Sequence, residues 1–318
     1  MSLNNVVKCS QKNKRVLIVG AGGFIGTNLV RSLSSVNNEV RAISRSFLDE
    51  RPIENVVRIK ADLSDAVLVR EHCEWADYVV YLVTESTPAT ASTNVVGSAE
   101  KDIIEALKFF ELCVEMRIKK LIYMSSGGTV YGDTKQIPTP ESTVLDPRNA
   151  YAVAKVAVEN YLAIYHQLHD LDYIILRVSN PYGPYQYATK KQGVIGGFGG
   201  LACKSEPVSL WGDGSIIRDY LYIDDLCEAI VKAIEYSGDH RVFNIASGIG
   251  HSLNEVLDLI RATGLEVKVE SKSCENVGVK TSVLDITMAN AELGWSPKTV
   301  IGDGISSFVA WYRQSGHQ

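Results

Sequence analysis

A glycine-rich turn between a strand pattern and a helical pattern constrains the fold of this chain more than any other feature. The run Arg15-Val-Leu-Ile-Val19 is typical of a buried strand, and the positions Ile25, Leu29 and Leu33 recur at helical spacing. Between the two patterns stands Gly20-Ala-Gly-Gly-Phe-Ile-Gly26. Only glycine allows so sharp a turn and so close an approach to a phosphate group. Because the N-terminus of the following helix offers free N–H groups, the pattern predicts a site for the pyrophosphate of a dinucleotide.

Strand and helix patterns continue to alternate after this turn. Further strand-like runs lie at 40–43, 56–59, 78–83, 121–124 and 173–178, and the longest helical patterns cover about 92–116 and 150–169. This alternation predicts an α/β protein with a Rossmann-type, doubly wound parallel sheet. After Asn180 glycine, proline and tyrosine become frequent and the periodicity fades. We therefore expect a dinucleotide-binding domain over 1–179 and a smaller α/β substrate-binding domain over most of 180–318, with segments near 222–246 returning to the first domain.

Composition excludes several classes of function. The formal net charge of −5 argues against a nucleic-acid binder, and no apolar run approaches the ~18 residues that a membrane span needs. The six cysteines form no CxxC pair, and neither they nor the histidines have metal-ligand spacing. We therefore expect no metal site, and a reduced, cytoplasmic protein.

Tyr151 and Lys155 carry the strongest chemical signal. They stand four residues apart in a helical pattern, so their side chains share one face. A free tyrosine has a pKa of ~10. A neighbouring ammonium and a positively charged nicotinamide favour the phenolate, so Tyr151 could act as a base near neutral pH. Together with the glycine turn, this pair predicts redox chemistry on a sugar-like alcohol.

The end of the second strand leaves the choice of cofactor open. NAD-selective enzymes usually have an acid there that binds the ribose 2′-hydroxyl, whereas this chain has Ser44 and Arg45. Arg45 could pair with the 2′-phosphate of NADP, stack on adenine or point to solvent. Asp62, after the third strand, is well placed to meet the adenine. We expect NAD, with NADP possible.

The chain resembles the extended short-chain dehydrogenase/reductase family, specifically its nucleotide-sugar epimerases and dehydratases. The resemblance covers nearly the whole chain. It rests on Gly20-x-x-Gly-x-x-Gly26, Asp62-Leu63, Asn94-Val-x-Gly97, Ser125-Ser-Gly-Gly-Thr-Val-Tyr-Gly132, Tyr151-x-x-x-Lys155, Arg177-x-x-Asn-x-x-Gly183, Gly212-Asp-Gly-x-x-x-Arg-Asp-Tyr220 and Leu293-Gly-Trp295.

The resemblance implies a set of site residues. Catalysis would use Tyr151 and Lys155 with Ser126 and Thr129. Cofactor contacts would come from Gly20, Gly23, Phe24, Ile25, Gly26, Ser44, Arg45, Asp62, Leu63, Val83, Asn94, Ser125, Tyr151 and Lys155. Substrate contacts would come from Thr84, Asn180, Arg218 and Ser282. The segment 177–183 would lie on the substrate side, and Asn180 and Arg218 would hold the substrate diphosphate, because guanidinium forms two charge-assisted bonds to phosphate oxygens. A salt bridge from Arg218 to Asp219 or Asp213 is the structural alternative.

Three departures from the family pattern bear on function. The family's catalytic Ser or Thr aligns with Gly127, so Ser126, Thr129 or a water must replace its hydroxyl. An Arg and an Asp that many relatives carry before Leu284 align with Glu275 and Gly278. A position that limits sugar size in relatives aligns with Ser282, and its small side chain predicts tolerance of N-acetylhexosamines.

The leading hypothesis is a nucleotide-sugar 4-epimerase that acts on a UDP-hexose or UDP-N-acetylhexosamine with a bound nicotinamide cofactor. A nucleotide-sugar 4,6-dehydratase is a less favoured alternative. Relatives that dehydrate have Asp and Glu directly after the catalytic Thr, whereas here those positions are Gly128 and Thr129 and carry no carboxylate. Two further alternatives remain. Arg45, which could pair with a 2′-phosphate, leaves open an NADPH-dependent nucleotide-sugar reductase. Gly127, which lacks the catalytic hydroxyl, leaves open a non-catalytic NAD(P)-binding sensor.

The resemblance also implies a homodimer, in which the helical patterns at about 98–116 and 150–169 would pair with their copies. Both carry more apolar side chains than one buried face needs, namely Ile103, Leu107, Phe110, Val153, Val156, Leu162 and Ile164. The alternative is that all of them pack on the sheet.

Overall fold

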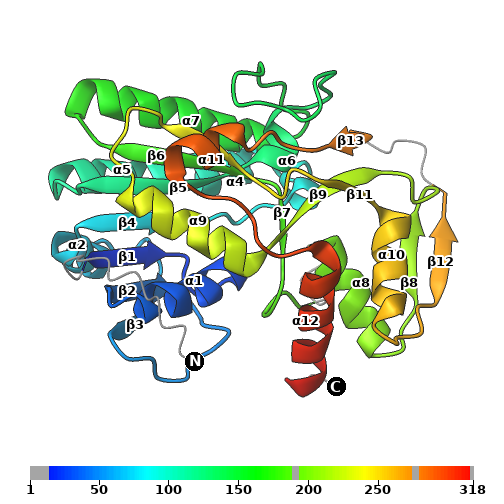
Figure 1. The fold of residues 1–318 in the computed structure, drawn as a ribbon. Coiled ribbons are helices and arrows are strands. Elements are labelled where there is room, and N and C mark those ends of the chain that lie inside the picture. Colours follow the sequence, from blue (N-terminus) through cyan, green and yellow to red (C-terminus); the bar gives the residue numbers. More distant parts are fainter. Residues whose placement is uncertain (1–13, 188–192, 274–278, 316–318) are drawn as a thin grey trace, which may run out of the picture.

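A seven-stranded parallel sheet forms the centre of the molecule (Figure 1). The computed structural model describes residues 14–187, 193–273 and 279–315. The strands lie in the order β10-β6-β5-β4-β1-β2-β3, with bounds β1 (Arg15–Val19), β2 (Glu39–Ser44), β3 (Val56–Lys60), β4 (Tyr78–Tyr81), β5 (Lys120–Ser126), β6 (Tyr173–Val178) and β10 (Val242–Ile245). Each neighbouring pair is parallel. The predicted α/β, Rossmann-type fold is confirmed.

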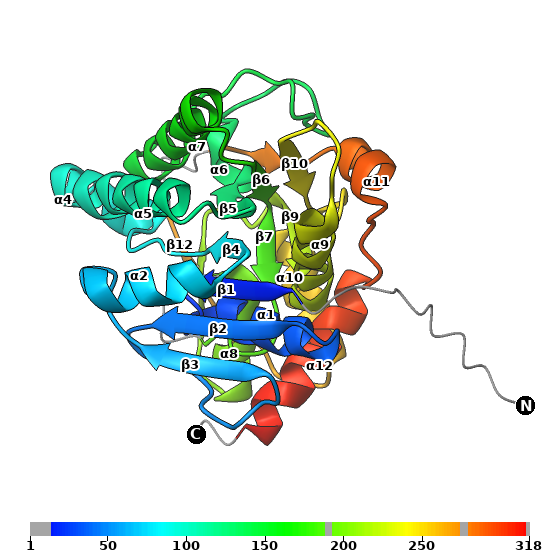
Figure 2. The same cartoon turned by 90° about the vertical axis from the view of Figure 1, so that its left-hand side faces the viewer.

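Helices cover both faces of this sheet because side chains alternate along each strand. In β1, Val16 and Ile18 pack in one apolar cluster and Leu17 and Val19 in another. The first cluster includes α1 (Phe24–Ser35) and α9 (Ile223–Glu235), and the second includes α2 (Ala66–Trp75), α5 (Glu105–Glu115) and α7 (Ala150–His169). Figure 2 shows the two helical layers on opposite sides of the sheet.

The strand order reverses at β1, which lies between β2 and β4. Ligands of open α/β sheets bind outside the carboxyl ends of the strands at such a switch point. The glycine turn that follows β1 therefore lies at the edge where this architecture holds a ligand.

The region predicted as one helix over about 92–116 is divided. It contains α4 (Val95–Ala99), a π-helical turn η1 (Glu100–Ile104) and α5, and a separate short helix α3 (Pro88–Ala91) precedes it. In a π-turn the hydrogen bonds join residues five apart, so the side chains at 101 and 102 are rotated from the places that an α-helix would give them.

The chain after Asn180 builds most of a second region, on the right in Figure 1. Its elements are β7 (Asn180–Tyr182), α8 (Val194–Cys203), β8 (Val208–Trp211), β9 (Ile217–Tyr222), β11 (Gly250–Ser252), α10 (Leu253–Ala262), β12 (Val269–Lys272), β13 (Thr281–Ser282) and α12 (Ile301–Gln314). Here β9 pairs with β11, β13 and β7, while β8 pairs with β12. Three elements from this part of the chain return to the main sheet, because β10 pairs with β6, α9 packs on α1, and α11 (Thr287–Leu293) packs on β10 and α9.

The outer face of α4, η1 and α7 carries exposed apolar side chains, including Val96, Ile104 and Leu168. Val153 and Ile164, predicted to supply a dimer surface, are also exposed. Phe110 and Leu162 were predicted with them but are fully buried, because both pack in the second apolar cluster, between the sheet and helices α2, α5 and α7.

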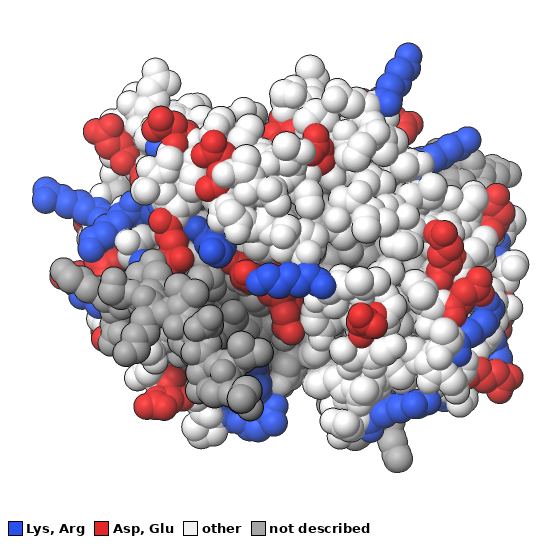
Figure 3. Space-filling model, viewed as in Figure 1, with Lys and Arg blue, Asp and Glu red and all other residues white. Residues whose placement is uncertain are grey.

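Charged side chains are interspersed on the face shown in Figure 3, where Lys and Arg lie among Asp and Glu. Within the described residues, no helix has the length and apolarity that crossing a bilayer requires.

Candidate functional site

The turn between β1 and α1 has the geometry of a phosphate cradle. Gly20 has a φ of +86°, which favours glycine. A Cβ at Gly22 would lie 1.6 Å from the Ser46 carbonyl oxygen, and one at Gly26 would lie 2.5 Å from Ala21 Cα. A Cβ at Gly23 would meet only the Gly20 carbonyl oxygen, at 3.6 Å, so protein packing does not require glycine there. Gly23 is also the N-cap of α1 and provides no side-chain cap, so the first-turn N–H groups face the space that a pyrophosphate would fill.

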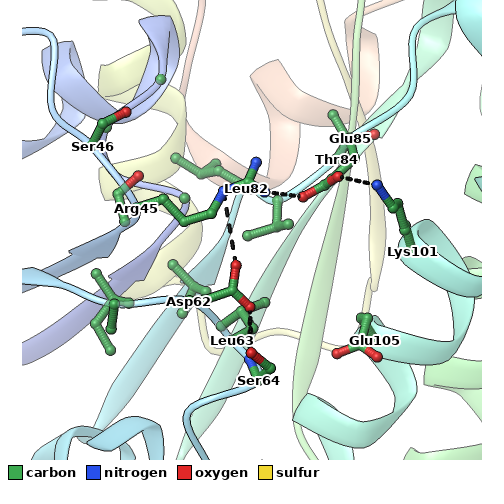
Figure 4. Close-up of a pocket in the computed structure, with 18 residues that line it drawn as sticks. Arg45, Ser46, Asp62, Leu63, Ser64, Leu82, Thr84, Glu85, Lys101 and Glu105 are labelled. Atoms are coloured by element: carbon green, nitrogen blue, oxygen red, sulfur yellow. Dashed lines mark hydrogen bonds and ion pairs between the residues drawn. The ribbon is translucent and has the colours of Figure 1, made fainter.

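A cavity of about 620 Å³ opens beside this turn (Figure 4). Its walls come from the carboxyl ends of β1, β2, β3 and β4 and from the start of α5. Of the residues predicted to bind cofactor, it brings together Gly20, Gly23, Ser44, Arg45, Asp62, Leu63 and Val83. Thr84, predicted on the substrate side, also lines this cavity. The residues present therefore fit a dinucleotide.

Ion pairs cross the rim of the cavity. The Arg45 guanidinium lies 2.7 Å from Glu85 and 3.9 Å from Asp62, and the Lys101 ammonium lies 3.0 Å from the other Glu85 oxygen. The pKa of Asp62 is lowered, first by hydrogen bonds from the Ser64 backbone and hydroxyl and then by Arg45. Sequence reasoning missed Glu85 and Lys101, because no motif joins the end of β4 to a π-turn sixteen residues later.

The other predicted cofactor residues do not line this cavity. Gly26 packs on Ala21, and Phe24 and Ile25 pack against the core. The Asn94 side chain accepts a hydrogen bond from Gly97 N and caps α4. Ser125 is buried, and its hydroxyl donates to Glu159.

Tyr151 and Lys155 lie on the first turns of α7, against the end of β5. The Lys155 ammonium is buried, donates to the Met124 carbonyl at 2.9 Å and lies 5.7 Å from the centre of the Tyr151 ring. Asn149 caps this helix by accepting a bond from Ala152 N, which fixes where the helix begins. The predicted pair therefore shares one face and one site.

Burial controls the charge state of this pair. It lowers the pKa of Lys155 to about 8, while negative charge at Asp102 and then Glu159 acts in the opposite direction. Burial also raises the pKa of Tyr151, and a hydrogen bond with the Ser126 side chain opposes that rise. Desolvation is therefore the dominant influence on the Tyr151 pKa in this structure.

Gly127, where the resemblance implies a catalytic hydroxyl, leaves no space for a side chain. A Cβ there would lie 2.4 Å from Leu284 Cδ1 and 2.8 Å from the Arg177 carbonyl oxygen. Of the two predicted substitutes, Ser126 lowers the Tyr151 pKa through a hydrogen bond, whereas the Thr129 hydroxyl donates back to the Ser126 carbonyl at 3.3 Å. Leu284, just after β13, thus occupies the space that a side chain at 127 would need.

A buried polar network lies behind Tyr151 and Lys155. The Arg177 guanidinium donates to Glu159 at 2.7 Å and to the Tyr131 hydroxyl at 3.0 Å. That hydroxyl donates to Asn244 Oδ1 at 2.7 Å, so the network reaches β10. The resemblance implied that segment 177–183 lies on the substrate side, and the Arg177 side chain itself is 7% exposed and paired with Glu159 inside the molecule.

The predicted substrate residues meet in the second region. Asn180 donates to the Asp219 carbonyl at 2.8 Å, and a Cβ at Gly128 would lie 3.7 Å from its amide nitrogen. Arg218 and Ser282 are neighbours on the paired strands β9 and β13. The Arg218 guanidinium donates to the carbonyls of Ile217, Val279 and Lys280.

The alternative of a salt bridge from Arg218 to Asp219 does not hold. The Asp219 carboxylate is fully buried and accepts bonds from Ser247 and from the Gly248 backbone. Glu275 and Gly278, the other aligned substrate positions, lie outside the described residues.

Residues 16–246 match the family model described as the NAD dependent epimerase/dehydratase family. The chain belongs to this family. The match spans the glycine cradle, Asp62-Leu63 and the pair on α7, which are among the motifs that carried the resemblance.

Curated relatives in this family have different activities. A UDP-glucose 4-epimerase from Mycolicibacterium smegmatis is 31% identical, covering 94% of this chain and 98% of the relative. A dTDP-4-dehydro-6-deoxyglucose reductase from Escherichia coli is also 31% identical, covering 92% of this chain and 96% of the relative. A human dTDP-D-glucose 4,6-dehydratase is 26% identical, covering 96% of this chain and 91% of the relative. The family is thus established, while the reaction is not decided by similarity alone.

Solved structures agree with the fold. A UDP-glucose 4-epimerase from Thermotoga maritima, in a structure with UDP-glucose, has a TM-score of 0.89 at 30% identity, covering 95% of this chain and 99% of that one. A UDP-glucose 4-epimerase from Thermus thermophilus, in complex with NAD, has a TM-score of 0.87 at 28% identity, covering 96% and 100%.

Proposed function

We propose that this protein is an NAD-dependent nucleotide-sugar 4-epimerase that acts on a UDP-hexose or UDP-N-acetylhexosamine. The observation that carries the proposal is the pairing of Tyr151 with the buried Lys155, whose ammonium lies 5.7 Å from the centre of the Tyr151 ring and donates to the Met124 carbonyl. A phenol beside an ammonium can pass a proton to and from an alcohol, and the neighbouring Ser126 would hold the oxygen of that alcohol.

The chain's own residues would handle the proton. Bound NAD⁺ supplies reversible hydride acceptance at C4 of the sugar. Tyr151 would take the proton of the C4 hydroxyl as that carbon is oxidised, and would return it after the 4-keto sugar has turned its other face. Ser126 would hold the reacting oxygen, and Lys155 would keep positive charge beside the phenolate. Because burial raises the Tyr151 pKa, positive charge in the complex is needed to bring this pKa down.

The second region would hold the nucleotide diphosphate through Asn180 and Arg218. Firm binding there and loose binding of the sugar are what the turning step requires, because binding energy then lies away from the reacting carbon. Arg218 supports this role, since its guanidinium is held by backbone carbonyls and is not neutralised by a described carboxylate.

A nucleotide-sugar reductase is the second candidate, and one observation favours it. The relative named dTDP-4-dehydro-6-deoxyglucose reductase is as similar as the mycobacterial epimerase. A reductase would use Tyr151 to donate a proton to a 4-keto oxygen and would consume one reduced cofactor in each turnover.

Product analysis separates these reactions. The purified protein is incubated with UDP-glucose, UDP-galactose and both UDP-N-acetylhexosamines without added cofactor, and the sugars are identified by NMR. A C4 epimer is expected. A 4-keto-6-deoxy sugar would indicate dehydration, turnover of a 4-keto sugar only with added reduced cofactor would indicate reduction, and no turnover of any sugar would favour a sensor.

Two variants on α7 test the proton transfer. Tyr151→Phe is expected to lower kcat by about 10²–10⁴-fold, the usual contribution of a positioned acid or base. Tyr161→Phe is the matched control, because Tyr161 lies on the same helix and is 42% exposed. Equal activity of the two variants would contradict the proposal. Ser126→Ala should cost more activity than Thr129→Val if Ser126 holds the sugar oxygen.

Ser282 leads us to expect turnover of N-acetylhexosamines, and faster turnover of the plain hexose would contradict that expectation. The exposed apolar face of α4, η1 and α7 supports a homodimer, which light scattering after size exclusion would test.

A further inference from the structure

We propose that Glu85, on the loop after β4, makes the cavity selective for NAD over NADP by holding Arg45 and by opposing a 2′-phosphate. The inference rests on the dinucleotide pocket of the proposed function, but not on which sugar reaction follows. It concerns the adenosine end of the pocket, where the sequence left the two cofactors open.

The ribose 2′ position of a dinucleotide lies at the carboxyl end of the second strand in this fold. Here that end carries Ser44 and Arg45 in place of an acid. The segment packs closely on the glycine turn, because a Cβ at Gly22 would lie 1.6 Å from the Ser46 carbonyl and 2.5 Å from the Ser44 hydroxyl oxygen. The Arg45 side chain is 64% exposed and can change its partner.

Arg45 is already paired. Its Nη1 lies 2.7 Å from Glu85, and its Nε lies 3.9 Å from Asp62 (Figure 4). A 2′-phosphate would have to replace the Glu85 carboxylate as partner of the guanidinium while lying close to that same carboxylate. The 2′-hydroxyl of NAD carries no charge and can donate a hydrogen bond to a carboxylate, so it meets no such repulsion.

Glu85 is fixed at both its backbone and its side chain by the π-turn η1. Its backbone N–H donates to Asp102 Oδ1 at 2.8 Å, and the neighbouring Ser86 hydroxyl donates to the same carboxylate. Lys101 donates to Glu85 Oε2 at 3.0 Å. Single π-turns frequently occur at functional sites. In this one, the consecutive residues Lys101 and Asp102 both hydrogen-bond to Glu85. The carboxylate is thus held at the rim before any ligand arrives.

The charge of the cavity wall acts in the same direction. Two cations, Arg45 and Lys101, face three anions, Asp62, Glu85 and Glu105, so the described lining has a net charge of −1. A phosphate monoester adds nearly two negative charges near pH 7. At water-like screening, one nearby unit charge changes the binding of such a dianion by about tenfold.

Binding measurements test the inference without sugar turnover. Protein freed of co-purified nucleotide is titrated calorimetrically with NAD⁺ and with NADP⁺, as wild type, Glu85→Gln, and Glu85→Gln combined with Arg45→Ala. Glu228→Gln is the matched control, because this acid also pairs with a lysine but lies on α9 and is not part of the cavity lining.

We expect wild type to bind NAD⁺ at least tenfold more tightly than NADP⁺. Glu85→Gln should lower the Kd for NADP⁺ about tenfold and change the Kd for NAD⁺ little. Adding Arg45→Ala to Glu85→Gln should remove the gain in NADP⁺ affinity. The control should keep the wild-type ratio. A wild-type preference for NADP⁺, or an unchanged ratio in Glu85→Gln, would overturn the inference. Binding of neither nucleotide to wild type would overturn the pocket assignment together with it.

Discussion

The same edge of the sheet holds charged side chains in two different ways. Beyond β2 and β4, the Arg45, Glu85 and Lys101 side chains are 64%, 28% and 62% exposed and pair across an open cavity. Near the carboxyl ends of β5 and β6, the side chains of Glu159, on α7, and Arg177, on β6, are 5% and 8% exposed and pair inside the molecule. The first group faces solvent, and the second lies behind the Tyr151 and Lys155 pair.

This difference separates two physical roles. Exposed ion pairs contribute about 0–1 kcal/mol and can exchange partners, so the rim can respond to a ligand. Breaking a buried pair costs several kcal/mol, because a charge is left without a partner in a poor solvent. We therefore expect substitutions in the buried group to change stability, and substitutions at the rim to change binding alone.

The largest effect is expected at Glu159. Glu159→Ala leaves the Arg177 guanidinium without its carboxylate and the Ser125 hydroxyl without its acceptor. We expect a loss of about 3–5 kcal/mol in the free energy of unfolding, measured by urea denaturation.

The control for this variant is Glu115→Ala, which breaks an exposed pair with Arg70. It should cost less than about 1 kcal/mol. If the two losses were equal, burial would not distinguish the two groups of charges. The milder Glu159→Gln serves if the alanine variant does not fold.

The next largest effect is a pH dependence of stability, which tests whether burial lowers the Lys155 pKa. Its pKa of about 8 in the folded chain lies below its ordinary value of 10.5. Between these values the unfolded chain binds one proton more, so stability increases with pH through this window. Relative to Lys155→Met, wild type should gain up to about 3 kcal/mol from pH 8 to 10.5.

This difference is measured by urea denaturation of both proteins at each pH, so that other titrating groups cancel. Lys108→Met serves as control, because Lys108 lies at the surface. A wild-type advantage that shrinks as pH rises would have the wrong sign and would refute burial as the cause.

A smaller loss is expected at Gly127. Gly127→Ser forces its Cβ against Leu284 Cδ1 and the Arg177 carbonyl, so we expect about 1–3 kcal/mol of destabilisation in urea melts. Adding Leu284→Ala should recover part of this loss. The comparison variant is Gly128→Ser, where a Cβ has 3.7 Å to its nearest neighbour. Equal losses at 127 and 128 would show that Leu284 does not fill the site.

The smallest effect is expected at the rim. Arg45→Ala breaks pairs that are largely exposed, so its free energy of unfolding should stay within about 0.5 kcal/mol of wild type. Thermal and urea denaturation without ligand check this. A loss above about 1.5 kcal/mol would place Arg45 with the structural charges and would break the comparison.

The sequence was sufficient wherever a function depends on neighbours along the chain. The glycine turn lies between one strand and one helix, and Tyr151 and Lys155 are four residues apart on one helix. Local periodicity and backbone sterics determine both, and both are found as expected. The alternation of strand and helix gave the sheet for the same reason.

Partners that come from distant segments could not be predicted. Tyr131 and Asn244 are 113 residues apart, and Lys101, on the π-turn η1, pairs with Glu85 sixteen residues earlier. The buried pair of Arg177 with Glu159 was not predicted either, because a motif shows which residue is present but not which way its side chain points. The sequence showed that Arg45 is charged. It did not show its partners Asp62 and Glu85, because their contact with Arg45 depends on how the ends of β2, β3 and β4 meet.

The packing of Leu284 against Gly127 also limits how this chain can change. A serine cannot enter at 127 until the leucine has been shortened, and shortening the leucine alone leaves an apolar void beside Val130 and Tyr131. Each single step is therefore unfavourable, although both steps together could be tolerated. Such epistasis would keep an ancestor or a designed variant on one side of the exchange.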